Sequence, residues 1–300
     1  MSQTHHHENH HHHDHHTMNG AFSIGIALNL GFVLIEVITG VWYHSLALLT
    51  DAGHNLGDVA GLVLVVIASR LSKRAANKHY TYGYGKSTIV VALINTIILL
   101  IAVGAIGWEA IGRLNRPEPV KGGVISLVAF VGVIINTISA FLFLKGKEKD
   151  VNVKGAYLHM AADALVSIGV LVSGIIIIYT NWFWLDAVIS LIIITVIIFS
   201  TWGLLKESLR LSLDGVPSGL DSQAVRDYLL SLKGVTALHD LHIWAMSTNA
   251  AALTVHLVIP EGIEDTFLVE VNNELHNRFN IDHTTIQVER STDAACEQKC

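Results

Sequence analysis

The sequence predicts a membrane α-helical protein with six transmembrane helices and a C-terminal α+β domain. Half of its residues (51%) are hydrophobic and only 15% are charged, a balance too apolar for an ordinary soluble protein. The apolar residues gather in runs of about 20, the length that an α-helix needs to cross a bilayer. After Lys206 the composition becomes ordinary and apolar residues alternate with polar ones, which indicates a separate folded domain.

Six apolar runs qualify as transmembrane helices, and all are rich in Ile, Val, Leu, Ala and Gly. They cover residues 21–43, 45–70, 88–111, 124–144, 155–179 and 182–204. Buried core helices of a soluble protein are the alternative, but six such runs in one chain favour a membrane domain over residues 20–205.

Lysine and arginine in the connecting loops predict how these helices are oriented. The second and fourth loops carry nine basic residues, whereas the loops on the other side carry three. Cytoplasmic loops are enriched in these residues, so both termini are expected in the cytoplasm. The N-terminus is acidic and rich in histidine where a cleavable signal peptide would be basic.

The C-terminal domain is expected over residues 206–291. Helices are predicted over 222–232 and 265–279, and strands over 238–245, 253–259 and 284–289. This helix–strand–strand–helix–strand order describes a small α+β domain of roughly 90 residues, a size that can hold its own core.

Both ends of the chain are predicted to be tails. Nine of the 18 histidines fall within residues 5–16, and this low-complexity segment, residues 1–19, is expected to be disordered. Such a tract either concentrates metal ions or is a flexible tail with incidental affinity for them. Residues 292–300 form the other tail, whose Cys296 and Cys300 suggest no disulfide framework and fit a reducing compartment. The net charge of −6 argues against nucleic acid as a partner.

Ionisable residues inside two of the predicted spans are the strongest functional signal. Each costs roughly 2.5–3.5 kcal/mol at the centre of a membrane helix, so such residues are usually functional. His54 and Asp58 stand four residues apart in the second span, and His159 and Asp163 repeat this spacing in the fifth. Residues at this spacing share one helix face.

Two such faces opposite each other supply two imidazoles and two carboxylates, a ligand set that suits tetrahedral Zn²⁺. The alternative is a structural network in which each His bonds to the Asp of its own helix, but two matched pairs favour the metal site. Metal binding requires neutral His and ionised Asp, so protons compete with the ion and zinc–proton exchange is a hypothesis. Asp51 either guides ion entry or forms a hydrogen bond, and the hydrogen bond is the favoured interpretation. For Glu36 a hydrogen bond between helices is favoured over a role as ligand, and Glu109 is expected to pair with Arg113.

Several segments together resemble the cation diffusion facilitator family, in its zinc-exporting zinc/cobalt/cadmium-resistance branch. The likeness runs from about residue 21 to residue 289. It is carried by SLALLTDAGHNLGD, HYTYGYGK, NVKGAYLHMAADALVSIGV, HDLHIW, LTVHLVIP and HTTIQVE.

The resemblance implies a homodimer of six-span subunits in a bacterial inner membrane, each with a cytosolic metallochaperone-like, ferredoxin-like domain. It also implies export of zinc, with cobalt and cadmium as further ions, from the cytoplasm in exchange for protons. Matching positions assign the transport ligands to His54, Asp58, His159 and Asp163.

A second, cytosolic metal site is implied in the C-terminal domain, where strand residues of one face could converge. Its residues by resemblance are His239, His256, His283 and Glu289, and Gln287 replaces a His found in some family members. His79 matches a region where relatives bind a peripheral ion, and Lys86 and Asp214 match an electrostatic pair. Ordinary strand histidines and a solvated loop His79 are the alternatives, and His242 is interpreted as structural.

Two other classes of function compete with transport. A membrane-bound metal sensor would not need a site at the centre of the membrane. An intramembrane zinc protease would need a general base such as that of HExxH, which the sequence lacks, and an open coordination position. The sequence therefore predicts a transporter and not an enzyme.

Overall fold

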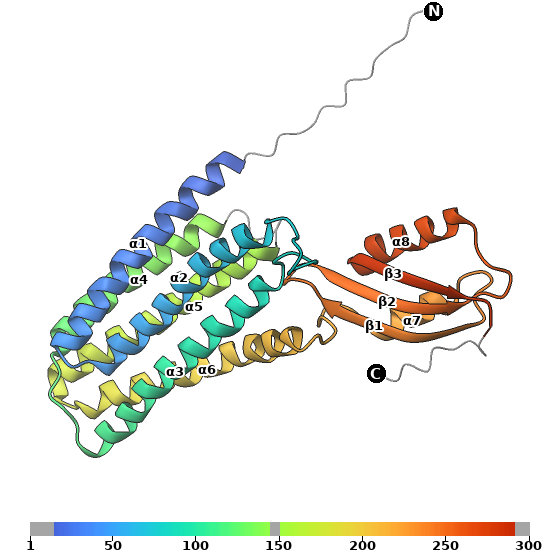
Figure 1. Ribbon diagram of the computed structural model, residues 1–300. Coiled ribbons are helices and arrows are strands. Elements are labelled where there is room, and N and C mark those ends of the chain that lie inside the picture. The colour runs from blue at the N-terminus through green and yellow to red at the C-terminus, as the bar shows by residue number, and fades with distance from the viewer. Residues whose placement is uncertain (1–14, 145–150, 292–300) are drawn as a thin grey trace, which may run out of the picture. The chain divides into compact units, whose positions relative to one another are not determined.

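The computed structural model describes residues 15–144 and 151–291, and six long helices precede the C-terminal domain (Figure 1). The His-rich run up to residue 14, the lysines at 145–149 and the cysteine-containing tail lie outside the described residues. The helices are α1 His15–Trp42, α2 Leu46–Ser72, α3 Ser87–Asn115, α4 Gly122–Leu144, α5 Val151–Thr180 and α6 Trp184–Ser212. Each contains most or all of one predicted span, so the six-helix prediction is confirmed.

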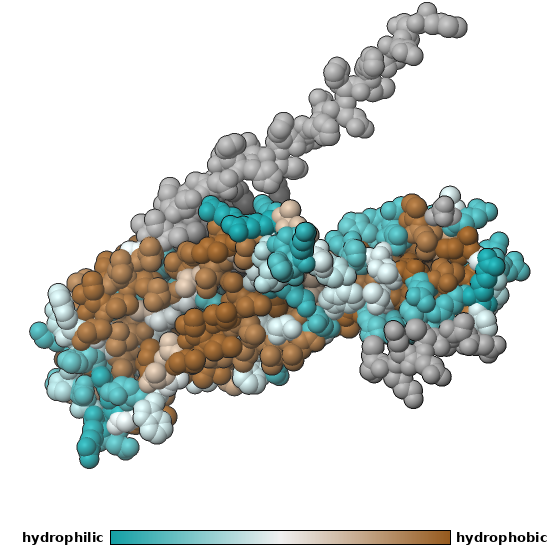
Figure 2. All heavy atoms as spheres, viewed as in Figure 1, coloured by the Kyte–Doolittle hydropathy of each residue, from teal (hydrophilic) through white to brown (hydrophobic). Residues whose placement is uncertain are grey.

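The surface of these helices is apolar, as a bilayer requires. Five of them, α2 to α6, are long and apolar enough to cross a membrane, and α1 adds the apolar stretch Asn29–Trp42. Figure 2 shows hydrophobic side chains covering the helices. Large apolar residues point outward, with Trp108 81% and Phe199 78% exposed. Exposed apolar surface on this scale is unfavourable in water and favourable in lipid. The chain is an integral membrane protein.

The chain divides into two compact units, and the division falls within α2, α3 and α6. One unit comprises residues 1–59 and 102–196, and the other comprises residues 60–101 and 197–300. In the first unit, α4 and α5 pack closely because glycines face each other. A Cβ atom on Gly122 would lie 2.5 Å from the carbonyl oxygen of Gly174, so larger residues would force these helices apart.

A buried carboxylate fixes the beginning of α2 in the same unit. Asp186, near the start of α6, accepts hydrogen bonds from the backbone N–H of Leu46 (2.7 Å) and of Ala47 (3.4 Å). It also accepts one from the hydroxyl of Ser45 at 2.6 Å. The first N–H groups of a helix have no partner within the helix, and a carboxylate there satisfies them and complements the helix dipole. Asp186 therefore anchors the helix that carries His54 and Asp58.

The C-terminal domain has the predicted element order. It contains α7 Ser222–Leu230, β1 Ala237–Ala245, β2 Ala251–Val258, α8 Asp265–Phe279 and β3 Ile281–Glu289. The sheet order is β1-β2-β3, with β1 and β2 antiparallel and β2 and β3 parallel. Parallel strands need a crossover connection, and α8 supplies it. The α+β prediction is confirmed.

One apolar core holds this domain together. Leu229 of α7 and Leu275 of α8 are fully buried with Leu253 and Leu257 of β2. The sheet therefore has helices packed on its apolar face, while the other face is left to polar residues.

A β-bulge interrupts β1 near its start. His239 pairs with His256, but the next paired residue, His242, lies opposite Thr254, so two residues of β1 oppose one of β2. Asp240 within the bulge has φ of 53°, a left-handed conformation that Asp tolerates better than most residues. The bulge re-aims the Asp240 side chain.

Candidate metal sites

The helices α2 and α5 bring together the four residues predicted for the transport site. His159 Nε2 lies 3.0 Å from Asp58 Oδ2, and His54 Nε2 lies 3.5 Å from Asp163 Oδ1. Within each helix, His54 Nε2 lies 3.7 Å from Asp58 Oδ2 and His159 Nε2 lies 3.6 Å from Asp163 Oδ2. Each histidine therefore contacts the carboxylates of both helices.

The four His–Asp separations are close to those in a tetrahedral zinc site. A zinc ion about 2.0 Å from each of four N or O ligands holds those ligands about 3.3 Å apart. The four His–Asp separations, 3.0 to 3.7 Å, bracket this value. The ligand atoms of His54, His159 and Asp163 all lie within 4.8 Å of one another. These three residues could hold a metal ion, and Asp58 adds a carboxylate oxygen 3.0 Å from His159 Nε2.

The exposure of the four side chains is graded along the helices. Asp163 is 3% and His54 15% exposed, whereas Asp58 is 29% and His159 40% exposed. Asp58 lies one turn farther along α2 than His54, and His159 lies one turn earlier in α5 than Asp163. The site is therefore more exposed on the side that faces the C-terminal end of α2 and the N-terminal end of α5.

The structure contains the hydrogen bonds predicted for Glu36, Asp51 and Glu109. Glu36 of α1 accepts a hydrogen bond from Asn55 Nδ2 of α2 at 3.3 Å. Asp51 of α2 accepts one from the Ser167 hydroxyl of α5 at 3.5 Å. Glu109 pairs with Arg113 at 3.0 Å, as their spacing on α3 predicted.

A second cluster forms on the sheet of the C-terminal domain. Glu289 of β3 accepts hydrogen bonds from His239 Nε2 of β1 and His256 Nδ1 of β2, both at 2.9 Å. The two imidazole rings lie 4.9 Å apart because His239 and His256 are paired in the register. The hydrogen bond from His239 holds the pKa of Glu289 below its usual value, so the carboxylate is ionised. The three residues form a ligand set of two imidazoles and one carboxylate.

Asp240 is a fourth member of this cluster, and its second acidic one, that the sequence interpretation missed. Its Oδ2 lies 3.8 Å from His256 Nε2, and its Oδ1 accepts a hydrogen bond from His242 at 2.9 Å. That bond lowers the pKa of Asp240. The only signal in the sequence was its place between two histidines in HDLH, because the bulge that turns it inward depends on strand register.

The structure does not bring His283 to this cluster. The register places it opposite Ala252, four residues before Gln287, which is the partner of His256. Its ring instead stands edge-on to that of Tyr82, with centroids 5.5 Å apart. His79 is exposed in the connection between α2 and α3, where its backbone N–H donates to Asn77 Oδ1. In the same region Lys86 forms an ion pair with Asp214, the contact that the resemblance implied.

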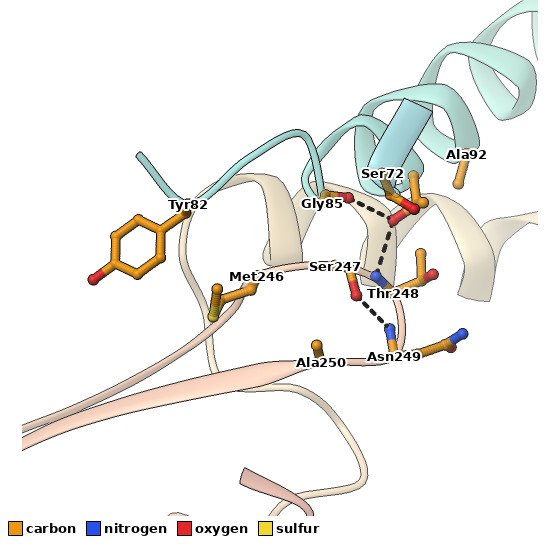
Figure 3. Close-up of a pocket in the computed structure, with 10 residues that line it drawn as sticks. Ser72, Tyr82, Gly85, Ala92, Met246, Ser247, Thr248, Asn249 and Ala250 are labelled. Atoms are coloured by element: carbon orange, nitrogen blue, oxygen red, sulfur yellow. Dashed lines mark hydrogen bonds between the residues drawn. The ribbon is translucent and has the colours of Figure 1, made fainter. Parts of the chain in front are cut away.

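A pocket of about 410 Å³ lies between the start of α3 and the hairpin that joins β1 to β2 (Figure 3). The backbone N–H of Thr248 donates to the Thr88 hydroxyl at 3.1 Å across it. Its polar lining consists of hydroxyl, amide and backbone groups, and none of the predicted metal ligands lines it. It therefore has no metal-binding character.

Known proteins match the whole architecture. Residues 23–211 match the family model described as the cation efflux transmembrane domain, and residues 217–291 match the cation efflux protein cytoplasmic domain. Both matched regions coincide with the helices and the α+β domain described above.

Curated bacterial relatives are similar over most of their length. The metal cation efflux system protein CzcD of Cupriavidus metallidurans is 40% identical, over 93% of this chain and 88% of that protein. The zinc transporter ZitB of Pectobacterium atrosepticum is 38% identical, over 86% and 81%. The cadmium, cobalt and zinc/H(+)-K(+) antiporter of Bacillus velezensis is 33% identical, over 86% and 84%.

These matches confirm the prediction of a transporter and not an enzyme. They also agree with the resemblance that the motifs of α2, α5 and the C-terminal strands carried. The chain belongs to the cation efflux, or cation diffusion facilitator, family, in its zinc/cobalt/cadmium branch.

Proposed function

We propose that this protein exports zinc from the bacterial cytoplasm across the plasma membrane in exchange for protons. The observation that carries the proposal is the meeting of two His–Asp pairs from α2 and α5, with His–Asp distances of 3.0 to 3.7 Å. The names of relatives support zinc as the main substrate and cobalt and cadmium as further substrates.

The ligand chemistry explains why zinc binds and how protons enter the cycle. Two neutral imidazoles and two ionised carboxylates give zinc its preferred N/O environment, and the dication neutralises the carboxylates. When the ion leaves, the same groups become free to take protons. An exchange of zinc for protons follows if the site meets the two sides of the membrane in turn.

The graded exposure of the site supports an entry route. Asp58 and His159 are its more exposed members, on the side that faces the C-terminal end of α2 and the N-terminal end of α5. We assign that side of the site to the cytoplasm, together with both termini, because the loops next to it are rich in Lys and Arg. Zinc would therefore enter past Asp58 and His159, and exit requires α2 and α5 to open at the other end.

The C-terminal domain is proposed to bind zinc as a regulatory ion and to join two chains in a homodimer. Its candidate ligands are His239, His256 and Glu289, whose contacts of 2.9 Å preorganise the site. The match to the cytoplasmic domain of cation efflux proteins supports this role. His283 and His79 are left out of the proposed sites because the structure places both apart from the clusters.

Purified protein in liposomes tests the exchange. Zinc and protons are followed with two dyes while a pH gradient is imposed in either direction. We expect zinc to move against the proton flow and faster when the compartment that receives zinc is acidic. A zinc flux that does not depend on the pH gradient, with no proton movement, would refute proton exchange. The absence of any zinc flux would favour a metal sensor.

A further inference from the structure

A pair of buried carboxyl groups lies beside the metal ligands and has no role as a ligand. Glu36 of α1 and Asp51 of α2 are 0% and 1% exposed, and the two side chains are within hydrogen-bonding reach of each other. No Lys or Arg contact is found for either one among the described residues. Asp51 precedes His54 by one helical turn, on the less exposed side of the site.

Three acceptor oxygens in and next to this pair receive no hydrogen bond. Glu36 Oε1, Asp51 Oδ1 and the amide oxygen of fully buried Asn55 have no partner in the described part of the chain. All three are acceptors, since ionised carboxylates and amide oxygens donate nothing. Buried acceptors normally receive a hydrogen bond, so the cluster needs a donor, and ionised carboxylates cannot be one. A proton on one carboxyl group supplies it.

The same conclusion follows from charge. Two adjacent carboxylates away from water cannot both be ionised, because burial and mutual repulsion both favour the neutral form. The titratable groups that face the pair from the surrounding helices are His54 of α2 and Asp163 of α5. From α4 the neutral amide of Asn136 donates to Ser167, the residue that bonds to Asp51.

Hydrogen bonds connect the pair to the helices of the metal site. The Asn55 amide donates to Glu36, and the Ser167 hydroxyl donates to Asp51 from a position one turn after Asp163. The pair thus touches α1, α2 and α5 at one level. A dication bound between His54 and Asp163 would repel a proton held here, whereas departure of the dication would favour its return.

We propose that Glu36 and Asp51 form a proton-binding site, distinct from the metal ligands, that holds the counter-ion of the exchange. In the zinc-free state the pair shares one proton, and the arrival of zinc expels it as H⁺, with only an O–H bond broken. This inference rests on the proposed zinc–proton exchange and names residues that carry part of it.

Counting protons released on zinc binding tests the inference in the full-length protein. Calorimetry in buffers of different ionisation enthalpy gives the protons released per zinc, and the pH dependence of the zinc affinity gives the same number independently. For Glu36→Gln with Asp51→Asn we expect about one proton fewer per zinc and a correspondingly shallower pH dependence. Glu36→Asp, which keeps an exchangeable proton, should restore the wild-type number.

The matched control is Glu109→Gln, which removes a carboxylate that is exposed and paired with Arg113, and it should release the wild-type number. If the double variant does not fold properly, each single variant is measured instead. A wild-type proton count in these variants would overturn the inference while zinc–proton exchange stands. A wild-type count with zinc affinity weakened more than about 10-fold would make the pair a metal subsite instead. A wild-type protein that releases no protons would refute both the inference and the exchange.

Discussion

His159 Nε2 of α5 lies 3.0 Å from Asp58 Oδ2 of α2, and this contact joins the two helices on the more exposed side of the transport cluster. The pair links residues that are 101 positions apart in the sequence. It is also the point at which an ion entering from that side would first meet both helices.

Asp58→Asn should weaken zinc binding by more than about 100-fold. The amide keeps the shape of Asp58 but removes its charge, and loss of an outer-shell partner alone typically costs 10- to 100-fold in metal affinity. Competition with a zinc-binding dye in detergent measures the change. Glu109→Gln should bind zinc as the wild type does. If the two variants bind zinc with equal affinity, Asp58 is not a zinc ligand.

His54→Asp should change which ion is preferred. The substitution leaves one imidazole with three carboxylates, and carboxylates suit Mn²⁺ better than imidazoles do. We expect the ratio of zinc to manganese transport in liposomes to fall about 10-fold. His79→Asp makes the same chemical change in an exposed loop and should leave the ratio alone. An unchanged ratio in the His54 variant would show that this residue does not set selectivity.

The C-terminal cluster should hold one zinc ion that depends on Glu289 and not on His283. In a chain that lacks residues 1–14, Glu289→Gln should lower the bound zinc by about one ion per chain. His283→Ala should retain that ion, because the His283 ring lies edge-on to Tyr82, apart from His239 and His256. Elemental analysis after gel filtration gives the count. Loss of an ion from the His283 variant alone would contradict the register argument.

Asp186→Ala should destabilise the first unit without touching a ligand. The change leaves the N–H groups of Leu46 and Ala47 unsatisfied, and each orphaned buried group costs about 1–3 kcal/mol. We expect the Tm in detergent to fall by at least about 3 °C. Asp186→Asn keeps one acceptor oxygen, so its Tm should lie between those of the wild type and the Ala variant. If the Ala variant has the same Tm as the wild type, other contacts anchor α2.

Much of this organisation could be predicted from local sequence. A helix that crosses a bilayer must be about 20 apolar residues long, so the runs that became α2 to α6 were visible directly. The i, i+4 spacing placed His54 with Asp58 and His159 with Asp163, and their cost in a membrane marked them as functional. The contact between the His–Asp faces of α2 and α5 depends on how the helices pack, and only the structure shows it.

Long-range register decided what could not be predicted. His283 and Glu289 lie on the same strand, but only the pairing of β2 with β3 shows that Glu289 reaches His256 and that His283 does not. Asp240 joins the cluster through a bulge with a left-handed residue, which its sequence permits but does not demand. Asp186 caps α2 across 140 residues, a contact that has no local signature.

The most direct test of the central claim is zinc uptake into inverted membrane vesicles that contain either the wild type or Asp163→Asn. Asp163 is the most buried of the four ligands, and Asn preserves its size while removing its charge. Expression and gel-filtration profile are matched first, and Glu109→Gln serves as the control. We predict that the control takes up zinc at the wild-type rate and that Asp163→Asn takes up none above empty vesicles. Uptake by Asp163→Asn at the wild-type rate would contradict the assignment of the transport site.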